Sequence, residues 1–226
     1  MSYKHLAPRG AQAATAAGTL MIVSQSHENL LCITDIIARG GVIAFRTDTF
    51  YGLGADPFNS GAVQKVKNLK GREGDKPILV LISDAEQLGR LIENRSASFD
   101  ELTKQFWPGA LTIIGKATDE LSNELTAGTK SVGVRLPNDE RVRSVVRACG
   151  GSLTATSANP SGEPPARSAE EALKYFGETV DLILDGGAAK TDQPSTVVDT
   201  TSDGGLKLVR EGVIAWDEIQ RALKGN

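Results

Sequence analysis

Segments with helical spacing of apolar residues alternate with short apolar runs from Glu28 onward, and this alternation limits the fold more than any other feature of the sequence. Residues 30–37 put their apolar side chains on one helical face, and Gly40 with Gly41 follows where that helix is expected to end. Residues 41–46 then predict a buried strand. Repeated alternation of this kind favours an α/β sheet with helices on its faces.

Short apolar runs continue along the chain and predict further strands. They lie at residues 77–82, 110–116, 131–135, 152–156, 180–184, 195–199 and 206–210. The later strands follow one another with short connections, which are typical of antiparallel neighbours, so we expect a mixed sheet of parallel and antiparallel strands. No linker after residue 28 is long enough to divide the chain. We therefore expect one domain at residues 28–226, preceded by a flexible leader at residues 1–27.

The scarcity of histidine excludes several familiar active sites. His5 and His27 are the only histidines, and both precede the first predicted helical face. A Ser-His-Asp triad, a Cys-His dyad and a His-rich zinc site all need histidine within the folded core. The remaining chemistry must come from Lys, Arg, Asp, Ser, Thr and backbone groups.

Charge and cysteine content narrow the class of protein further. The formal net charge is −3, whereas a dedicated nucleic-acid binder is usually basic. Two cysteines, Cys32 and Cys149, cannot build a disulfide framework for 226 residues, so a reducing cytoplasm is the expected location. No apolar run approaches the ~18 residues that a membrane helix needs. The composition thus predicts a soluble, cytoplasmic globular protein.

Polar segments follow several of the predicted strands, and ligands in open α/β sheets bind at the carboxyl ends of strands. Residues 47–54, with the sequence TDTFYGLG, supply hydroxyls and glycines after the first strand. Residues 157–159 (Ser-Ala-Asn) follow another strand, and Arg135 ends a third, where it can clamp a carboxylate. Each segment has an ordinary structural alternative: a capped turn, an Asx or Ser turn, and a surface salt bridge.

Three cations lie close together at Lys70, Arg72 and Lys76, next to a predicted buried strand. Neighbouring cations repel one another unless an anion sits among them. Arg presents a planar fork to phosphate, and Lys presents a compact charge. An anion site is therefore one hypothesis, and a solvated charged loop is the other. No phosphate loop of the GxxxxGK[ST] form occurs, so any ATP site must have a different architecture.

Taken together and in order, these segments resemble the YrdC/YciO family of threonylcarbamoyl-AMP synthases. The resemblance covers residues 40–212. The matching pieces are TDTFYGLG from Thr47, KGR from Lys70, KP at Lys76, FWPGALT from Phe106, SVGVRLP from Ser131, TSANPSG from Thr156, STVVD from Ser195 and VREG from Val209. The family implies a YrdC/RibB-like fold, in which a strongly twisted mixed sheet is flanked by helices and forms an open concave cleft.

The family also implies a reaction. Threonine and bicarbonate form a carbamate, whose oxygen attacks the α-phosphate of ATP, so that pyrophosphate leaves with Mg²⁺ and threonylcarbamoyl-adenylate remains. The implied class is nucleotidyltransferase, and no metal ligand among the protein side chains is expected. A separate protein complex then transfers the group to tRNA, as the t6A modification, and tRNA or double-stranded RNA is a further implied partner.

The resemblance implies roles residue by residue. Thr49, Arg135 and Ser195 match threonine contacts, with Arg135 holding the carboxylate. Lys70 and Arg72 match basic residues that are expected to act in catalysis. The residues that match nucleotide contacts are Lys70, Arg72, Lys76, Ser131, Ser157, Asn159, Arg167 and Arg210.

Three departures from the family pattern leave other functions open. Arg46 stands where many members have proline, and Leu81 stands where some relatives have a histidine near threonine. The chain also resembles the shorter form of the family, without the second domain that longer relatives carry after the position of Gly212. One alternative is a non-catalytic RNA- or tRNA-binding module of the same fold. Another is a paralogue that uses a different substrate.

Overall fold

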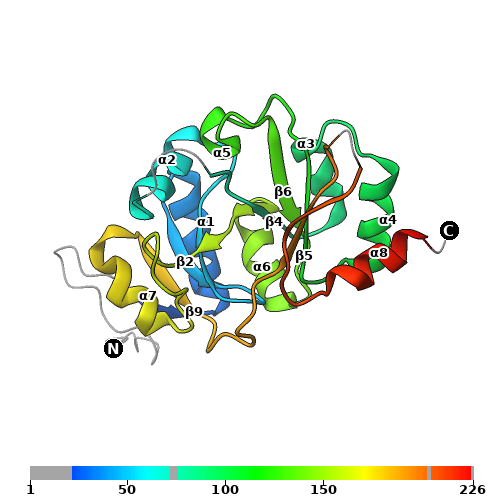
Figure 1. The fold of residues 1–226 in the computed structure, drawn as a ribbon. Coiled ribbons are helices and arrows are strands. Elements are labelled where there is room, and N and C mark those ends of the chain that lie inside the picture. The colour runs from blue at the N-terminus through cyan, green and yellow to red at the C-terminus, as the bar shows by residue number, and fades with distance from the viewer. Residues whose placement is uncertain (1–21, 72–75, 203–204, 225–226) are drawn as a thin grey trace, which may run out of the picture.

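The structure is a computed structural model that describes residues 22–71, 76–202 and 205–224. In this part of the chain the strands form two mixed sheets with helices packed on their outer faces (Figure 1). The mixed α/β character predicted from the sequence is confirmed, although the strands divide between two sheets. The predictions for Arg72 and for residues 1–21 of the leader lie outside the described residues.

The first sheet contains the segment that carries the TDT motif. Its order is β1-β9-β2-β3-β8, in which β1, β9 and β2 run parallel, whereas β3 and β8 are each antiparallel to the strand before them. The strands are β1 (Ile22–Ser24), β2 (Ile43–Arg46), β3 (Tyr51–Gly54), β8 (Thr156–Ser157) and β9 (Leu182–Asp185). Residues 47–50 form the turn between β2 and β3, so the motif lies at one end of this sheet.

The second sheet has the order β11-β10-β5-β6-β4-β7. Parallel pairs join β10 to β5 and β6 to β4, and the other neighbours are antiparallel. The strands are β4 (Val80–Ile82), β5 (Leu111–Lys116), β6 (Ser131–Arg135), β7 (Ser152–Thr154), β10 (Thr196–Asp199) and β11 (Lys207–Arg210). Several of these strands bring alternate side chains to one face, since the side-chain period of a strand is two.

A single residue, Ala155, carries the chain from one sheet to the other. β7 ends at Thr154 in the second sheet, and β8 begins at Thr156 in the first. The Thr154 hydroxyl accepts a hydrogen bond from the Ala55 backbone N–H at 2.8 Å, and the Thr154 N–H donates to the Ala55 carbonyl at 2.9 Å. These bonds hold the sheets together where the TSANPSG segment begins.

Most of the helices begin at polar caps that the sequence supplies. The helices are α1 (His27–Ala38), α2 (Ser60–Leu69), α3 (Leu88–Leu91), α4 (Ala97–Phe106), α5 (Asn123–Thr126), α6 (Glu140–Ala148), α7 (Ala169–Phe176) and α8 (Trp216–Lys224), with short 3-10 turns at Ala85–Gln87 and Gly177–Thr179. Ser26, Asn59 and Ser168 each accept a backbone N–H of the first turn of α1, α2 and α7. Such caps satisfy donors that a helix cannot satisfy itself.

One apolar core lies where α1 and α6 pack against strands of both sheets. Ile33 of α1 and Val146 of α6 are fully buried there, together with Phe45, Leu81 and Leu153 of the strands. Burial of apolar side chains supplies most of the favourable free energy of folding. This core fixes the back of β2 and β4, whose ends carry residues of the site described below.

Residues 22–27, which the sequence analysis assigned to a flexible leader, belong to the fold. Residues 22–24 form β1, which pairs with β9, and α1 begins at His27. The Gln25 backbone N–H donates to the Asp185 carbonyl at 3.2 Å, and the Gln25 side chain donates to the Arg141 carbonyl at 2.7 Å. A strand of three residues is too short to show a period, which is why the pattern missed it.

Among the helices of the described residues, none combines the length and the apolar composition that a bilayer crossing requires.

Candidate active site

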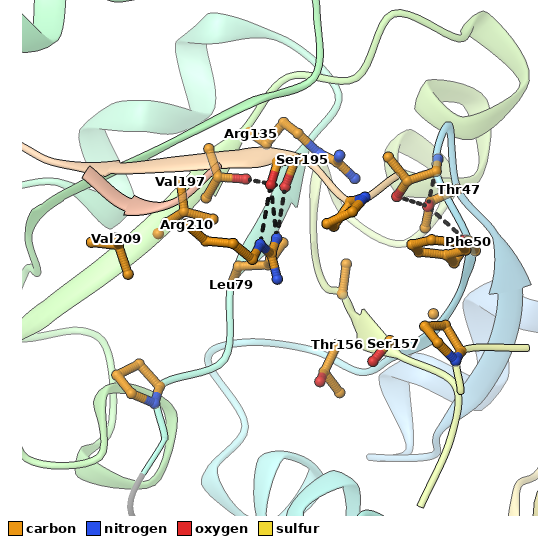
Figure 2. A pocket seen from close by; sticks show the side chains of 18 of the residues that line it. Thr47, Phe50, Leu79, Arg135, Thr156, Ser157, Ser195, Val197, Val209 and Arg210 are labelled. Atoms are coloured by element: carbon orange, nitrogen blue, oxygen red, sulfur yellow. Dashed lines mark hydrogen bonds between the residues drawn. The ribbon is translucent and has the colours of Figure 1, made fainter. Parts of the chain in front are cut away.

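A cavity of about 540 Å³ lies where the two sheets meet. Its walls come from the β2–β3 turn, from β5, β6, β10 and β11, and from the segment that joins β7 to β8. Figure 2 shows Arg135, Ser195 and Arg210 on one side, the turn with Thr47 and Phe50 on the other, and Thr156 with Ser157 below. Of the predicted site residues, Thr49, Lys76, Arg135, Ser157, Ser195 and Arg210 line this cavity.

The β2–β3 turn is held by its own threonines. The Thr47 hydroxyl donates to the Phe50 carbonyl at 2.6 Å and accepts the Thr49 backbone N–H at 3.1 Å. The Thr47 and Thr49 hydroxyl oxygens are 3.1 Å apart. A Cβ on Gly52 would lie 3.3 Å from the Thr156 carbonyl, so a glycine lets β3 approach β8 closely. The buried Thr49 is therefore fixed in the cavity wall.

Arg135 is the most unusual side chain of the site. It ends β6, only 3% of its side chain is exposed, and its Nη2 lies 3.0 Å from Oδ1 of Asp48. Its Nε and Nη1 are buried and find no hydrogen-bond acceptor within the described part of the chain. A buried donor without a partner costs about 1–3 kcal/mol. A ligand with anionic oxygens would supply the missing acceptors.

Arg210 and Ser195 form the adjoining part of the wall. Nε and Nη2 of Arg210 donate to the Ser195 carbonyl at 3.2 and 2.9 Å, and the Ser195 hydroxyl oxygen is 3.0 Å from that of Thr112. A Cβ on Gly212 would lie 2.1 Å from the Pro194 carbonyl oxygen, so only glycine fits beside this segment. Burial and the neighbouring charge of Arg135 both lower the pKa of Arg210.

The charges of the cavity favour an anionic ligand. Lys76, Arg135 and Arg210 line it, and the described lining residues include no Asp or Glu; Asp48 contacts Arg135 from beside the wall. The described residues also hold no cluster of three His, Cys, Asp or Glu side chains suited to a metal ion. Guanidinium and ammonium groups bind carboxylates and phosphates, and they do not bind cations.

An apolar surface lies beside the charged groups. It is formed by Pro77, Leu79, Ile114, Val197 and Val209. A flat apolar group, such as a nucleotide base, can pack on a surface of this kind. The cavity therefore combines an anion-binding side with a side for an apolar ring.

Lys70 lies behind the cavity wall and is not one of the residues that line the cavity. It caps α2, is 1% exposed, and donates from Nζ to the Ser157 carbonyl at 2.6 Å and to Oδ1 of Asn159 at 2.9 Å. Asn159 in turn donates to the Glu163 carbonyl at 2.6 Å. Lys70 therefore fixes the segment that presents Ser157 to the cavity. The predicted contacts of Lys70 and Asn159 with the nucleotide remain predictions.

Two further predicted nucleotide contacts, Ser131 and Arg167, are not among the residues that line the cavity. Ser131 begins β6, at the end opposite Arg135, and its hydroxyl oxygen is 2.9 Å from that of Thr129. Arg167 is exposed, and its backbone N–H donates to Glu171 at 2.7 Å. Neither residue is part of the lining. Leu81 is fully buried in the core under α1 and α6, so it does not reach the cavity.

The sequence analysis missed lining residues that a strand period of two would have found. Thr112 and Ile114 of β5 are two residues apart, and both line the cavity; Val197 also lines it, two residues after Ser195, which was predicted. In each pair the first residue supplies a hydroxyl and the second an apolar surface. Alternation over residues 112–114 and within the STVVD segment was the available signal.

These features define an α/β protein with a cavity for a ligand that has both anionic and apolar parts. A family model described as "Telomere recombination" (Sua5/YciO/YrdC) matches residues 35–212. The chain belongs to the Sua5/YciO/YrdC family.

Named relatives agree with this assignment. A threonylcarbamoyl-AMP synthase of Bacillus subtilis is 36% identical over 189 residues, which are 83% of this chain and 54% of the relative. One from Pyrococcus abyssi is 33% identical over 187 residues, 83% of this chain and 55% of the relative. The solved structure of P. abyssi Sua5 complexed with L-threonine matches with a TM-score of 0.83 and 30% identity, over 91% of this chain and 59% of that one. This chain spans about half the length of the curated relatives.

Proposed function

We propose that the protein is an L-threonylcarbamoyladenylate synthase, a nucleotidyltransferase that forms threonylcarbamoyl-AMP and pyrophosphate from L-threonine, bicarbonate and ATP. The observation that carries the proposal is Arg135, a buried guanidinium with two unpartnered nitrogens at a cavity with further cations. The names of the two curated relatives, and the relative solved with L-threonine, supply the substrate class.

The threonine subsite would lie around Arg135. Its guanidinium would bind the threonine carboxylate, since two parallel hydrogen bonds to a carboxylate suit its geometry. Thr49 and Ser195 line the same cavity with hydroxyl groups and would contact the rest of the amino acid. The ion pair with Asp48 holds Arg135 at one nitrogen, while its buried Nε and Nη1 have no acceptor among the described residues.

The ATP subsite would use the remaining cations and the apolar surface. Lys76 and Arg210 would bind phosphate oxygens, Ser157 would hydrogen-bond the nucleotide, and the base would pack on Leu79 and Val209. Lys70 would contribute by holding Ser157 and Asn159. Mg²⁺ would arrive with ATP and be held by its phosphate oxygens, because the described lining consists of cations and neutral groups.

The proposed reaction follows from this arrangement. The threonine amino group and bicarbonate form a carbamate with loss of water, and a carbamate oxygen then attacks the α-phosphorus of ATP as the bond to pyrophosphate breaks. The carbamate is already an anion, so the protein must mainly align the reactants and stabilise phosphate charge. Arg210 and Lys76 are suited to the second task, and burial within the cavity limits hydrolysis.

The wider role follows from the product. Threonylcarbamoyl-AMP would be consumed by a separate transferase complex that modifies tRNA to t6A, and the proposed location is the cytoplasm. The two cysteines, Cys32 and Cys149, are not joined to each other, which suits a reducing compartment.

Pyrophosphate release tests the proposal directly. We expect release that requires ATP, Mg²⁺, bicarbonate and L-threonine together, and that falls to background when any one is omitted. Equal release without threonine or without bicarbonate would contradict the assignment. Salt-dependent RNA binding without any release would instead favour the RNA-binding module, and release that depends on a different amino acid would favour the paralogue.

A further inference from the structure

One buried carboxylate, Asp139, joins segments of the chain that lead to residues of the cavity wall. Its Oδ2 accepts hydrogen bonds from Nη2 of Arg46 and from Nζ of Lys190, both at 2.9 Å. Its Oδ1 accepts the Arg141 backbone N–H at 3.0 Å and thereby caps α6. The Asp139 and Arg46 side chains are 6% and 4% exposed, whereas that of Lys190 is 66% exposed.

Each partner in this cluster is next to a segment that lines the cavity. Arg46 ends β2 and directly precedes Thr47 in the β2–β3 turn. Asp139 follows Arg135 by four residues, after the end of β6. Lys190 belongs to residues 186–194, which lead to Ser195. Asp139 therefore connects the turn, the end of β6 and the approach to Ser195.

Residues 186–194 belong to no helix or strand, so their position depends on side-chain contacts together with a few backbone hydrogen bonds. The Tyr51 hydroxyl donates to the Gly187 carbonyl at 2.8 Å, and the Ala189 backbone N–H donates to the Arg167 carbonyl at 2.8 Å. Burial raises the pKa of Tyr51, so its hydroxyl remains a donor. The ion pair of Lys190 with Asp139 is the charged contact of this segment.

The carboxylate of Asp139 is charged at every pH used for assays. Burial raises the pKa of Asp139, but the hydrogen bonds from Lys190 and Arg46 lower it more, to about 2. The buried guanidinium of Arg46 depends on Asp139 for an opposite charge. It has little other support, because its Nε is buried without a hydrogen-bond acceptor in the described residues. Removal of Asp139 would leave Arg46 as an uncompensated buried charge, which is strongly destabilising. Lys190 is the partner that can be changed without that consequence.

We propose that Lys190 is a positioning residue: through Asp139 it holds residues 186–194 so that Ser195 stays aligned with Arg210 and Thr112 at the threonine side of the cavity. The substrate assignment in this inference rests on the proposed function. An exposed ion pair contributes little to stability, so the effect of Lys190 on the site can be separated from an effect on folding.

The test compares Lys190→Ala and Lys190→Arg with Lys104→Ala. Lys104 is the matched control, since its side chain is 73% exposed and pairs with Glu101 at 3.8 Å. We expect Lys190→Ala to raise the threonine KM roughly threefold or more, with the ATP KM and the melting temperature nearly unchanged. Backbone hydrogen exchange in residues 186–194 should become faster. Lys190→Arg should restore both readouts, and Lys104→Ala should change neither.

Two results would overturn the inference: exchange in residues 186–194 that equals wild type in Lys190→Ala, or faster exchange with no change in the threonine KM. A wild-type protein that releases no pyrophosphate would contradict the proposed function. In that case hydrogen exchange alone decides whether Lys190 holds the segment, and unchanged exchange overturns the inference.

Discussion

Lys70→Met is expected to reduce the turnover of threonine-dependent pyrophosphate release by about 100-fold, since a shift of about 1 Å in a segment that positions reacting groups can cost that much. Methionine fills a similar volume but cannot donate to the Ser157 carbonyl or to Asn159. The segment at residues 157–163 would then lose its anchor. Melting temperature should also fall, because buried acceptors are left without donors.

Lys65→Met is the control for this substitution. Lys65 lies on the same helix, and its Nζ donates to the Gly40 carbonyl at 2.8 Å, away from the cavity lining. We expect this variant to keep turnover near wild type. Steady-state kinetics, with circular dichroism to confirm folding at the assay temperature, decides the comparison. Turnover of a folded Lys70→Met protein within about threefold of wild type, a difference below ~1 kcal/mol, would show that turnover does not depend on the anchoring of this segment by Lys70.

Arg135→Lys is expected to raise the KM for threonine by at least ~10-fold, while the KM for ATP moves much less. Lysine keeps the charge but lacks the planar fork that binds a carboxylate with two hydrogen bonds. Hydrogen bonds to charged groups contribute about 1.5–3 kcal/mol. The orphaned Nε and Nη1 of Arg135 are the donors that this substitution removes.

Titration of threonine and ATP separately on the folded variant measures this effect. Arg95→Lys serves as the control, since Arg95 pairs with Asp100 at 2.7 Å on the surface and its side chain is 42% exposed. A rise in the KM for ATP with an unchanged KM for threonine would mean that Arg135 belongs to the phosphate side. The threonine subsite would then have to be rebuilt around Thr49 and Ser195.

Local sequence patterns predicted the helices and strands well where a periodic run of apolar residues was long enough to be recognised. The helical face at residues 30–37 and the strand at residues 131–135 are both present in the structure. The division into two sheets was not predictable in this way, because it depends on pairings between distant strands, such as β2 with β9. The single-residue crossing at Ala155 has no signature in a local pattern.

The site was predictable where a polar residue ends a strand, as Arg135 does. Lys70 was singled out from the sequence, but its burial was not predictable, because a lysine at a helix end normally faces solvent. Its burial depends on acceptors at Ser157 and Asn159, 87 and 89 residues further along the chain. Arg167 shows the opposite case, since a basic residue near a motif can remain exposed.

The most direct test of the account follows the carbon of bicarbonate into the product. The protein is incubated with ATP, Mg²⁺, L-threonine and ¹³C-labelled bicarbonate. The nucleotides are then separated, and their masses are measured by mass spectrometry. The account predicts an adenylate with the mass of threonylcarbamoyl-AMP that carries one heavy carbon, formed in step with pyrophosphate. An adenylate of threonine without the heavy carbon, or AMP alone at all times, would contradict it.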